Sequence, residues 1–519
     1  MHYRRHQPYR LIEGFEPLEK TGIEILHRRV LAELKPHGCT QILNSVLASL
    51  SNSPRGPHEV ASAPWLTLLI AKWAMQDPMV PTKMGRPLPQ EKLTELVNLL
   101  WNAPLEASPN VWLLVRSNFH VQYQWQVDDL MGFIRWPALI ARQHPNSLIR
   151  RQFVQTIGME PDDYIDLSFA LSGGILNRDG PLNPNWLNAL RNSYPTQLDG
   201  IVKMFAHSLH ELRHEMRSDE AQRIRGRSEL YEFPYLKRYP LLLRRDGLHV
   251  WHSKVFKQGV EDAVDMRMSV SLGEEYSQTF SKVFEQYVTE LSTPLSEAAL
   301  TEKAFWSEFG RDRRAAEVVI PGKFGNVFIE AKMSLYADEI MLTDDEAVAR
   351  QKTFQLRDAF EKAISAGNTL RSRPFADGIF DKLEDFLIIV TSRSLLIRDA
   401  QILSELYRDS WDPYKGDAQA AQRMPLLNAV ILGISDFEKL IGAVRSNDLD
   451  LSKVLRDATR ANADPMTGKM LFLQHLPRTR WGKTPVLWNA TERSLERLSI
   501  ALGQPSSSII SAPDDPDSD

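Results

Sequence analysis

Two carboxylates face each other in the segment AEVVIPGKFGNVFIEAK, residues 316–332. The stretches on either side of PGKFGN are apolar and rich in β-branched residues, which predicts two antiparallel strands joined by a turn. If Ile320 pairs with Val327, Glu317 lies directly opposite Glu330. Opposed carboxylates repel each other, so this pair of strands needs a positive charge between them.

A divalent cation would supply that charge. Lys332 shares a strand face with Glu330, because side chains two residues apart point the same way, and it could neutralise part of the repulsion. Carboxylate oxygens are the ligands that Mg²⁺ prefers, together with water and phosphate. The pattern therefore predicts that Glu317 and Glu330 bind Mg²⁺ or Mn²⁺, which would polarise a phosphodiester and activate a bound water. Lys332 would orient or deprotonate that water, or stabilise the developing charge.

A strand acid followed by E-x-K on the next strand, between two helices, resembles the PD-(D/E)XK nuclease superfamily over roughly residues 228–400. The resemblance implies that Glu317, Glu330 and Lys332 form the catalytic site of an endonuclease, with DNA favoured over RNA. Members of this superfamily often carry a glutamate on the helix before the sheet, and Glu285 in FSKVFEQYV fills that position. By analogy of architecture, a large helical domain fused to such a core resembles restriction or anti-phage defence effectors.

Two features of the motif stay open in the sequence. Most members of the superfamily have Asp at the first strand position, where this chain has Glu317, so Asp312 is an alternative metal ligand. Members also carry Gln or Lys on the helix after E-x-K, and the candidates here are Gln351, Lys352 and Gln355.

A second motif, H-E-x-x-H, begins at His210. On a helix His210 and His214 would share one face, as zinc binding requires, with Glu211 as the general base. However, Arg213 places a cation inside the motif, and no third ligand is marked out, so we interpret the segment as a solvated helix face. A zinc metallopeptidase stays an alternative function. A nuclease fold that binds nucleic acid without cutting it is another.

Basic residues gather in two places that could contact nucleic acid. Residues 223–245 combine arginine and lysine with aromatic residues, and RDRR (311–314) comes just before Glu317. Cationic side chains neutralise phosphates, and aromatic rings stack on bases. The candidate nucleic-acid contacts are Arg223, Arg225, Arg227, Lys237, Arg238, Arg313 and Arg314.

The 519-residue chain is too long for a single core, and its patterning predicts a multi-domain α and α/β protein. Helical spacing dominates the first part, which we expect to sense a trigger or to bind a partner or nucleic acid. Within the nuclease region, KAFWSEFGR, AAEVVI and NVFIEAK are expected as three strands, followed by a helix and the buried strand DFLIIVTSR. The predicted domains are an all-helical domain (1–215), a mixed α/β nuclease domain (216–400), a small C-terminal α/β extension (401–505) and a disordered acidic tail (506–519).

Composition limits the class of protein. A net charge of −4 means that any nucleic-acid binding must come from local patches. The single cysteine, Cys39, excludes a disulfide within the chain and a cysteine-based metal site, and it favours the cytoplasm. The most apolar run, APWLTLLIAKWAM (63–75), is too short to span a bilayer and is expected as a buried helix. We therefore expect a cytoplasmic protein that does not bind membranes and that could assemble with a partner subunit or with itself.

Overall fold

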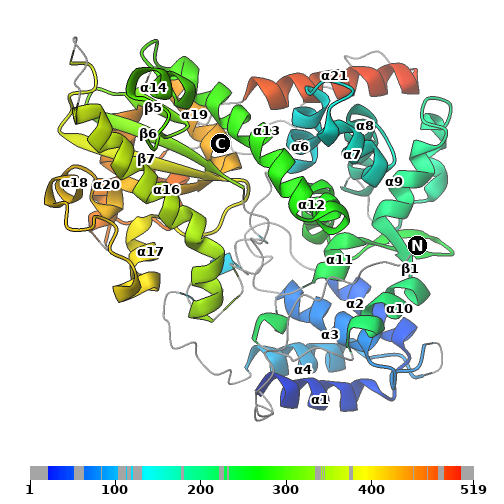
Figure 1. Ribbon diagram of the computed structural model, residues 1–519. Coiled ribbons are helices and arrows are strands. Elements are labelled where there is room, and N and C mark those ends of the chain that lie inside the picture. The colour runs from blue at the N-terminus through cyan, green and yellow to red at the C-terminus, as the bar shows by residue number, and fades with distance from the viewer. Residues whose placement is uncertain are drawn as a thin grey trace, which may run out of the picture. The chain divides into compact units, whose positions relative to one another are not determined.

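The protein divides into two compact units in the structure, which is a computed structural model (Figure 1). Unit 1 comprises residues 1–107, 121–273 and 489–519, and unit 2 comprises residues 108–120 and 274–488. The structure describes residues 22–51, 63–82, 85–102, 113, 119–120, 125, 131–176, 180–220, 227–230, 233–333, 341, 343, 345–372, 378–447, 449–464, 466–476 and 484–503. The predicted acidic tail, 506–519, lies outside these residues.

Unit 1 is mainly helical, as its apolar periodicity predicts. Helix α3 is buried along its whole length, including Lys72, which confirms the buried helix expected there. Among the described residues we find no helix that is long and apolar enough to cross a membrane. The helices are α1 (Gly22–Leu34), α2 (Cys39–Ser51), α3 (Pro64–Gln76), α4 (Gln90–Trp101), α6 (Gly132–Ala141), α7 (Leu148–Ile157), α8 (Pro161–Leu176), α9 (Gln197–Phe205), α10 (Leu209–Glu220), α11 (Pro234–Arg238), α12 (Ser253–Leu272) and the part of α21 (Pro485–Leu502) from Asn489 on.

A small sheet interrupts the helices of unit 1, so the first 215 residues are not entirely helical. Strand β1 (Ala206–Ser208) pairs in parallel with β2 (Leu241–Arg244), and β2 pairs antiparallel with β3 (Gly247–Val250). The predicted domain boundary at residue 215 falls inside α10. β1 also pairs with a strand beyond that boundary, so the two sides belong to one unit.

Unit 2 contains a five-stranded sheet in the order β4-β5-β6-β7-β8. Strand β5 runs antiparallel to both β4 and β6, whereas β6, β7 and β8 run parallel to one another. The strands are β4 (Leu300–Thr301), β5 (Val318–Pro321), β6 (Gly325–Lys332), β7 (Glu384–Thr391) and β8 (Ala429–Gly433). The helices are α13 (Glu274–Ser292), α14 (Glu302–Phe309), α16 (Glu346–Ser372), α17 (Ala400–Tyr407), α18 (Ala418–Arg423), α19 (Ile434–Ser446) and α20 (Leu451–Ala463).

The register of the β5–β6 pair is the one the sequence predicts. Ile320 pairs with Val327 and Val318 pairs with Ile329, and the same register continued by one residue beyond β5 would put Glu317 opposite Glu330. The turn between the strands holds this register, with the Gly322 amide donating a hydrogen bond of 3.0 Å to the Gly325 carbonyl. The predicted buried strand DFLIIVTSR is β7, which also pairs with β6.

Helix α16 covers one face of this sheet (Figure 1). Small and apolar residues of the helix, among them Ala359 and Ala363, pack in one core cluster with Phe328 of β6. Side chains alternate along a strand, so the face that carries Phe328 also carries Glu330 and Lys332. Glu330 and Lys332 therefore point to the side of the sheet on which α16 lies.

The segment KAFWSEFGR is a helix, α14, and the prediction of a strand there is wrong. Phe305 and Phe309 lie one turn apart and pack against each other, with ring centroids 4.7 Å apart. Thr301 caps the helix by accepting a hydrogen bond from the Ala304 amide, 3.3 Å, and the helix stops at Gly310, whose φ is 99°. The aromatic residues suggested a strand, but their spacing and the two caps favour a helix.

The region beyond residue 400 contributes to the same sheet. Strand β8 pairs with β7 along its length, and helix α19 follows it directly, as the pattern NAVILGISDFEKLIGAV predicts. The predicted extension 401–505 therefore shares the sheet of the predicted nuclease domain, and its end from Asn489 belongs to unit 1.

Candidate active site

Glu330 is the buried centre of the candidate site. Its side chain has no exposed surface, and Lys332 donates a hydrogen bond of 2.9 Å to Oε2. The other oxygen, Oε1, accepts no hydrogen bond of good geometry, although the Lys362 ammonium lies 3.1 Å from it. A buried carboxylate oxygen without a well-aligned donor is costly, so this oxygen is suited to bind a cation.

Lys362 of α16 brings the carboxylates together. Its Nζ lies 3.1 Å from Glu330 Oε1, 3.4 Å from Glu317 Oε1 and 3.5 Å from Glu302 Oε1. Only 16% of its side chain is exposed. The predicted cation between Glu317 and Glu330 is therefore present in the metal-free protein as a lysine from a different element.

Neither Lys362 nor Glu302 is among the candidates that the sequence suggested. A signal for Lys362 does exist, because it lies three residues after Ala359 and four before Ala366, both fully buried. A lysine on the buried stripe of an amphipathic helix needs an acidic partner inside the fold. Glu302 gave no such signal, because its segment was expected to be a strand.

The charges at the site shift one another's pKa values. Burial raises the pKa of Glu330, and the Lys332 and Lys362 charges oppose this effect. Burial acts to lower the pKa of Lys362, but the carboxylates of Glu330 and Glu317 outweigh it and raise that pKa above the usual value. The lysine is thus held as an ammonium ion at neutral pH.

Glu285 joins this group from α13, as the resemblance implies. Its pKa is raised by burial first and then by the negative charge of Glu317, while Lys332 and Lys362 act in the opposite direction. Because the charges of Glu317, Lys332 and Lys362 all shift the pKa of Glu285, this glutamate belongs to the same charged cluster. Helix α13 also contacts β6 directly.

The charge balance and the ligand chemistry of the site fit a divalent cation. Four ionised carboxylates carry −4 and two ammonium groups carry +2, which leaves −2. Oxygen ligands without histidine or cysteine suit Mg²⁺ or Mn²⁺. As they stand, the carboxylates are arranged around an ammonium ion, and within the described part of the chain no three His, Cys, Asp or Glu side chains form a group that could hold a metal.

The alternatives that the sequence left open lie elsewhere. Asp312 is 80% exposed, and its carboxylate lies 3.7 Å from the guanidinium of the neighbouring Arg313. On α16, Gln351 and Gln355 are exposed and Lys352 is half-buried. The side chain of α16 that contacts Glu330 is instead Lys362, more than a turn closer to the C-terminus.

The predicted nucleic-acid contacts fall in both units. Lys237 and Arg238 belong to α11 of unit 1, where the Arg238 guanidinium lies 5.4 Å from the centre of the Tyr239 ring. Arg313 and Arg314 are exposed residues of unit 2 in the segment that leads to Glu317. Arg223 and Arg225 lie outside the described residues, as does the side chain of Arg227.

The H-E-x-x-H segment is an exposed helix start. His210, Glu211 and His214 are exposed on α10, whereas Arg213 is buried and donates a hydrogen bond of 2.8 Å to the Val80 carbonyl. Glu211 accepts from the Ser208 amide, 2.8 Å, while the Glu211 amide donates to the Ser208 hydroxyl, 3.3 Å. This reciprocal pair is a capping box, so the glutamate of the motif stabilises the helix end.

We expect Glu211→Ala to lower the free energy of unfolding by about 1 kcal/mol, the usual effect of losing a capping interaction. A double His210→Ala, His214→Ala variant should leave it unchanged, because both rings are exposed. Urea unfolding measures both effects. Metal analysis of protein purified without chelator should give well under one zinc per chain. Stoichiometric zinc that disappears in the double histidine variant would support the peptidase instead.

Comparison with known proteins does not assign this chain to a family. No family model matches it, and neither a curated protein nor a solved structure gives a significant match. The functional argument therefore depends on the residues of the site and their geometry.

Proposed function

We propose that unit 2 is a metal-dependent nuclease that hydrolyses phosphodiester bonds, with DNA as the expected substrate. The observation that carries the proposal is the meeting of Glu317, Glu330 and Lys332 on adjacent strands, around a fully buried carboxylate. A salt-bridge cluster on an exposed sheet face would not bury Glu330. It also would not gather more carboxylates than cations.

Glu317 and Glu330 would hold Mg²⁺ or Mn²⁺ in this nuclease. When bound, such a cation supplies a Lewis acid for the phosphoryl oxygen and a water of lowered pKa. The side chain of Glu317 is 11% exposed, so its carboxylate can face a substrate. The side chain of Glu330 is fully buried and would bind the metal from the protein side. Glu285, whose raised pKa favours the protonated form more than usual, could donate a proton at the edge of the site.

Lys332 acts on the substrate side of Glu330. Its ammonium group has three donor hydrogens. One of them forms the hydrogen bond to Glu330 Oε2, with a distance of 2.9 Å between Nζ and Oε2. With 18% of the side chain exposed, the group can also donate to a non-bridging phosphoryl oxygen. A fixed cation at this place would orient the phosphate and stabilise the charge that develops on it during attack.

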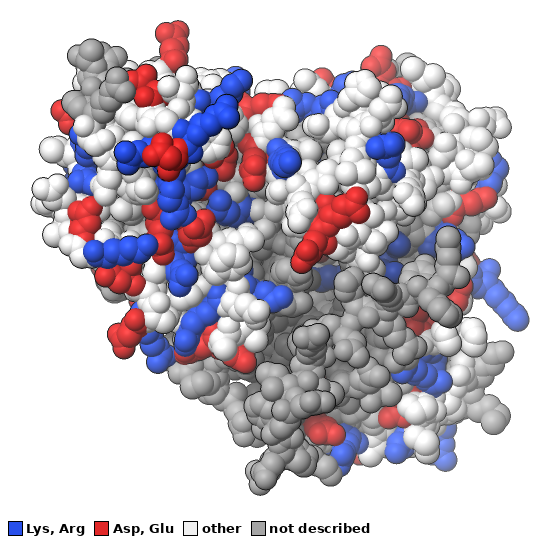
Figure 2. Space-filling model, in the orientation of Figure 1, with Lys and Arg blue, Asp and Glu red and all other residues white. Residues whose placement is uncertain are grey.

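Arg313 and Arg314 are cationic residues that lie close in sequence to Glu317 of the site. Figure 2 shows lysine and arginine side chains over the part of unit 2 in which Figure 1 draws α14 and α16, with acidic side chains among them. A mixed surface of this kind attracts phosphate locally without making the molecule basic. This agrees with the net charge of −4.

The direct test is incubation of the purified full chain with plasmid DNA and with RNA, in Mg²⁺, in Mn²⁺ and in EDTA. We expect cleavage of DNA that requires the metal and stops in EDTA. Binding of nucleic acid without cleavage in any metal would instead support the inactive binding module. In that case Lys362 would permanently replace the cation.

Substitutions at Glu317 and Asp312 should identify the second metal ligand. Glu317→Gln keeps the shape but loses the charge, and we expect at least a hundredfold loss of cleavage, on the order of a few kcal/mol of transition-state stabilisation. Glu317→Asp retracts the carboxylate by about 1.5 Å, one carbon–carbon bond. It should keep partial activity, better in Mn²⁺ than in Mg²⁺, because Mg²⁺ demands near-ideal geometry.

The matched control is Asp312→Asn, which removes an exposed carboxylate from the same segment and should cleave at nearly the wild-type rate. Cleavage rates of the three variants in both metals make the comparison. Loss of activity in Asp312→Asn together with a normal rate in Glu317→Gln would transfer the metal ligand to Asp312.

A further inference from the structure

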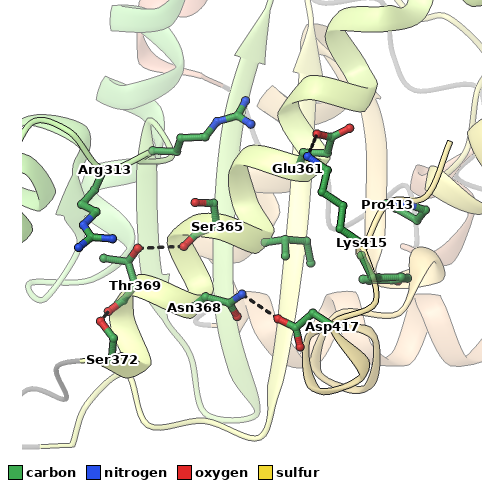
Figure 3. Close-up of a pocket in the computed structure, with 12 residues that line it drawn as sticks. Arg313, Glu361, Ser365, Asn368, Thr369, Ser372, Pro413, Lys415 and Asp417 are labelled. Atoms are coloured by element: carbon green, nitrogen blue, oxygen red, sulfur yellow. Dashed lines mark hydrogen bonds and ion pairs between the residues drawn. The ribbon is translucent and has the colours of Figure 1, made fainter.

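A pocket of about 490 Å³ lies against the C-terminal half of α16 (Figure 3). Its walls come from the segment before β5, from the C-terminal half of α16 and from the loop between α17 and α18. The volume is within the range of about 300–1,000 Å³ that is typical of small-molecule sites. The lining residues are Arg313, Arg314, Glu361, Ile364, Ser365, Asn368, Thr369, Ser372, Pro413, Tyr414, Lys415 and Asp417.

The lining combines three kinds of group that a nucleotide requires. Arg313, Arg314 and Lys415 are cations for a phosphate. Tyr414 offers an aromatic ring, and apolar residues beside it complete a surface for a base. The hydroxyl groups of Ser365, Thr369 and Ser372 can accept hydrogen bonds from a sugar or from the edge of a base, whereas Asn368 and Asp417 bind each other.

The three cations of the pocket already form ion pairs, Arg314 with Asp358, Lys415 with Glu361 and Arg313 with Asp312. Lys415 lies 3.1 Å from Glu361 and is 74% exposed, and Arg313 lies 3.7 Å from Asp312 and is 58% exposed. Exposed pairs of this kind contribute roughly 0–1 kcal/mol, so a phosphate group can compete with them. Asp417, in contrast, is engaged by Asn368, 2.9 Å, and by the first amide groups of α18.

Two chain segments connect the pocket to the candidate active site. Arg314 is three residues before Glu317, so their Cα atoms are at most about 11 Å apart. Glu361 of the pocket is the neighbour of Lys362, whose side chain reaches Glu317 and Glu330. A ligand in the pocket would thus contact α16 on a different face from Lys362, whose side chain reaches Glu317 and Glu330.

We propose that this pocket binds one nucleotide unit, with its phosphate against Arg313 and Arg314 and its base against Tyr414. The choice of ligand rests on the proposed nuclease function, which makes a nucleic-acid strand the natural source of that unit. A base can enter a concave pocket only when it is out of a duplex stack, so the source is a single strand or a free mononucleotide.

The test measures binding in EDTA, where no cleavage occurs. A fluorescently labelled 12-nucleotide single strand is titrated by anisotropy, and dAMP and inorganic phosphate are titrated by calorimetry. Arg313→Ala removes one phosphate contact, Ser365→Trp fills the pocket, and Arg311→Ala is the matched control, because it removes an arginine of the same segment that does not line the pocket. Circular dichroism confirms that each variant is folded.

We expect Kd for the single strand to rise about tenfold in Arg313→Ala and in Ser365→Trp, the size of effect usual for one stacked base. Arg311→Ala should stay within twofold of the wild type. Saturable dAMP binding would identify a free nucleotide as a ligand, and binding of the strand alone would identify the nucleic acid; both results support the pocket. Unchanged strand and dAMP affinities in Ser365→Trp would overturn it, as would phosphate binding as tight as dAMP binding.

The same measurements separate this inference from the proposed function. Glu290→Gln, which removes a carboxylate of α13 that does not line the pocket, should bind the strand normally in EDTA. Loss of binding in the pocket variants, with no cleavage by the wild type in any metal, would keep the pocket and reject the nuclease. Cleavage that depends on Glu330, with normal binding in folded pocket variants, would keep the nuclease and reject the pocket.

Discussion

Glu330→Gln should lower metal-dependent cleavage on the order of a thousandfold, because it removes the buried carboxylate around which the site is built. A thousandfold loss corresponds to about 4 kcal/mol, within the several kcal/mol that a bound metal contributes to such a reaction. Gln keeps the volume of the side chain and can still accept the hydrogen bond from Lys332. The measurement is the initial rate of plasmid cleavage at saturating Mg²⁺.

The same variant should unfold at the wild-type temperature or slightly above it in EDTA. Burial raises the pKa of Glu330, so holding the ionised carboxylate in the folded protein costs free energy that the neutral amide of Gln does not. The site also has more carboxylates than ammonium groups, and the substitution reduces that excess. Thermal unfolding in EDTA, followed by circular dichroism, tests this expectation.

Glu290→Gln is the matched control, since it removes one carboxylate from α13 that forms a hydrogen bond of 3.0 Å with Gln286, away from the buried group. It should leave the cleavage rate unchanged. If Glu330→Gln cleaved at the wild-type rate, the site would be misassigned. If it unfolded far below the wild-type temperature, Glu330 would act mainly as a structural ion-pair partner of the two lysines.

The parts of the site that are local in sequence were predictable. Glu317, Glu330 and Lys332 lie within sixteen residues of one another, and the turn PGKFGN with apolar strands on both sides determines their register. Side chains then alternate between the two faces of the strand, which places Glu330 and Lys332 on the same face. The same reasoning predicts the buried strand β7, whose apolar run leaves little choice of environment.

The parts that depend on distant contacts were not predictable in the same way. Lys362 reaches Glu330 only because α16 packs across the face of β6, and periodicity shows which side of a helix is buried without showing what lies against it. The pairing of β8 with β7 likewise joins segments about forty residues apart. This pairing explains why unit 2 does not end near residue 400, where the predicted nuclease domain was expected to end.

The largest expected effect on stability is at Lys362. Lys362→Met keeps the length and the apolar stem of the side chain but removes the ammonium group that Glu302, Glu317 and Glu330 share. In EDTA we expect the variant to lose about 2–3 kcal/mol of stability, somewhat less than the 3–5 kcal/mol typical of breaking a fully buried pair. For a unit of this size, such a loss lowers the unfolding temperature by roughly 5–10 °C.

The same substitution should strengthen metal binding. In the wild type a cation must enter a group of carboxylates that already holds an ammonium ion, with Nζ 3.1–3.5 Å from three of them. Removing that ammonium leaves the carboxylates with one positive charge fewer, so we expect the affinity for Mn²⁺ to rise about tenfold or more, roughly 1.4 kcal/mol or more. Saturating Mn²⁺ should then restore most of the lost thermal stability, because a ligand that binds only the folded state stabilises it.

Lys303→Met is the matched control, because Lys303 is exposed and adjacent in sequence to Glu302. It also removes one positive charge, yet it should change neither the unfolding temperature nor the Mn²⁺ affinity by much. Calorimetric titration with Mn²⁺ and thermal unfolding with and without the metal compare the two variants. If Lys362→Met unfolded early and Mn²⁺ neither bound more tightly nor restored its stability, Lys362 would be a permanent structural counterion. The carboxylates around it would then belong to a salt-bridge cluster and not to a metal site.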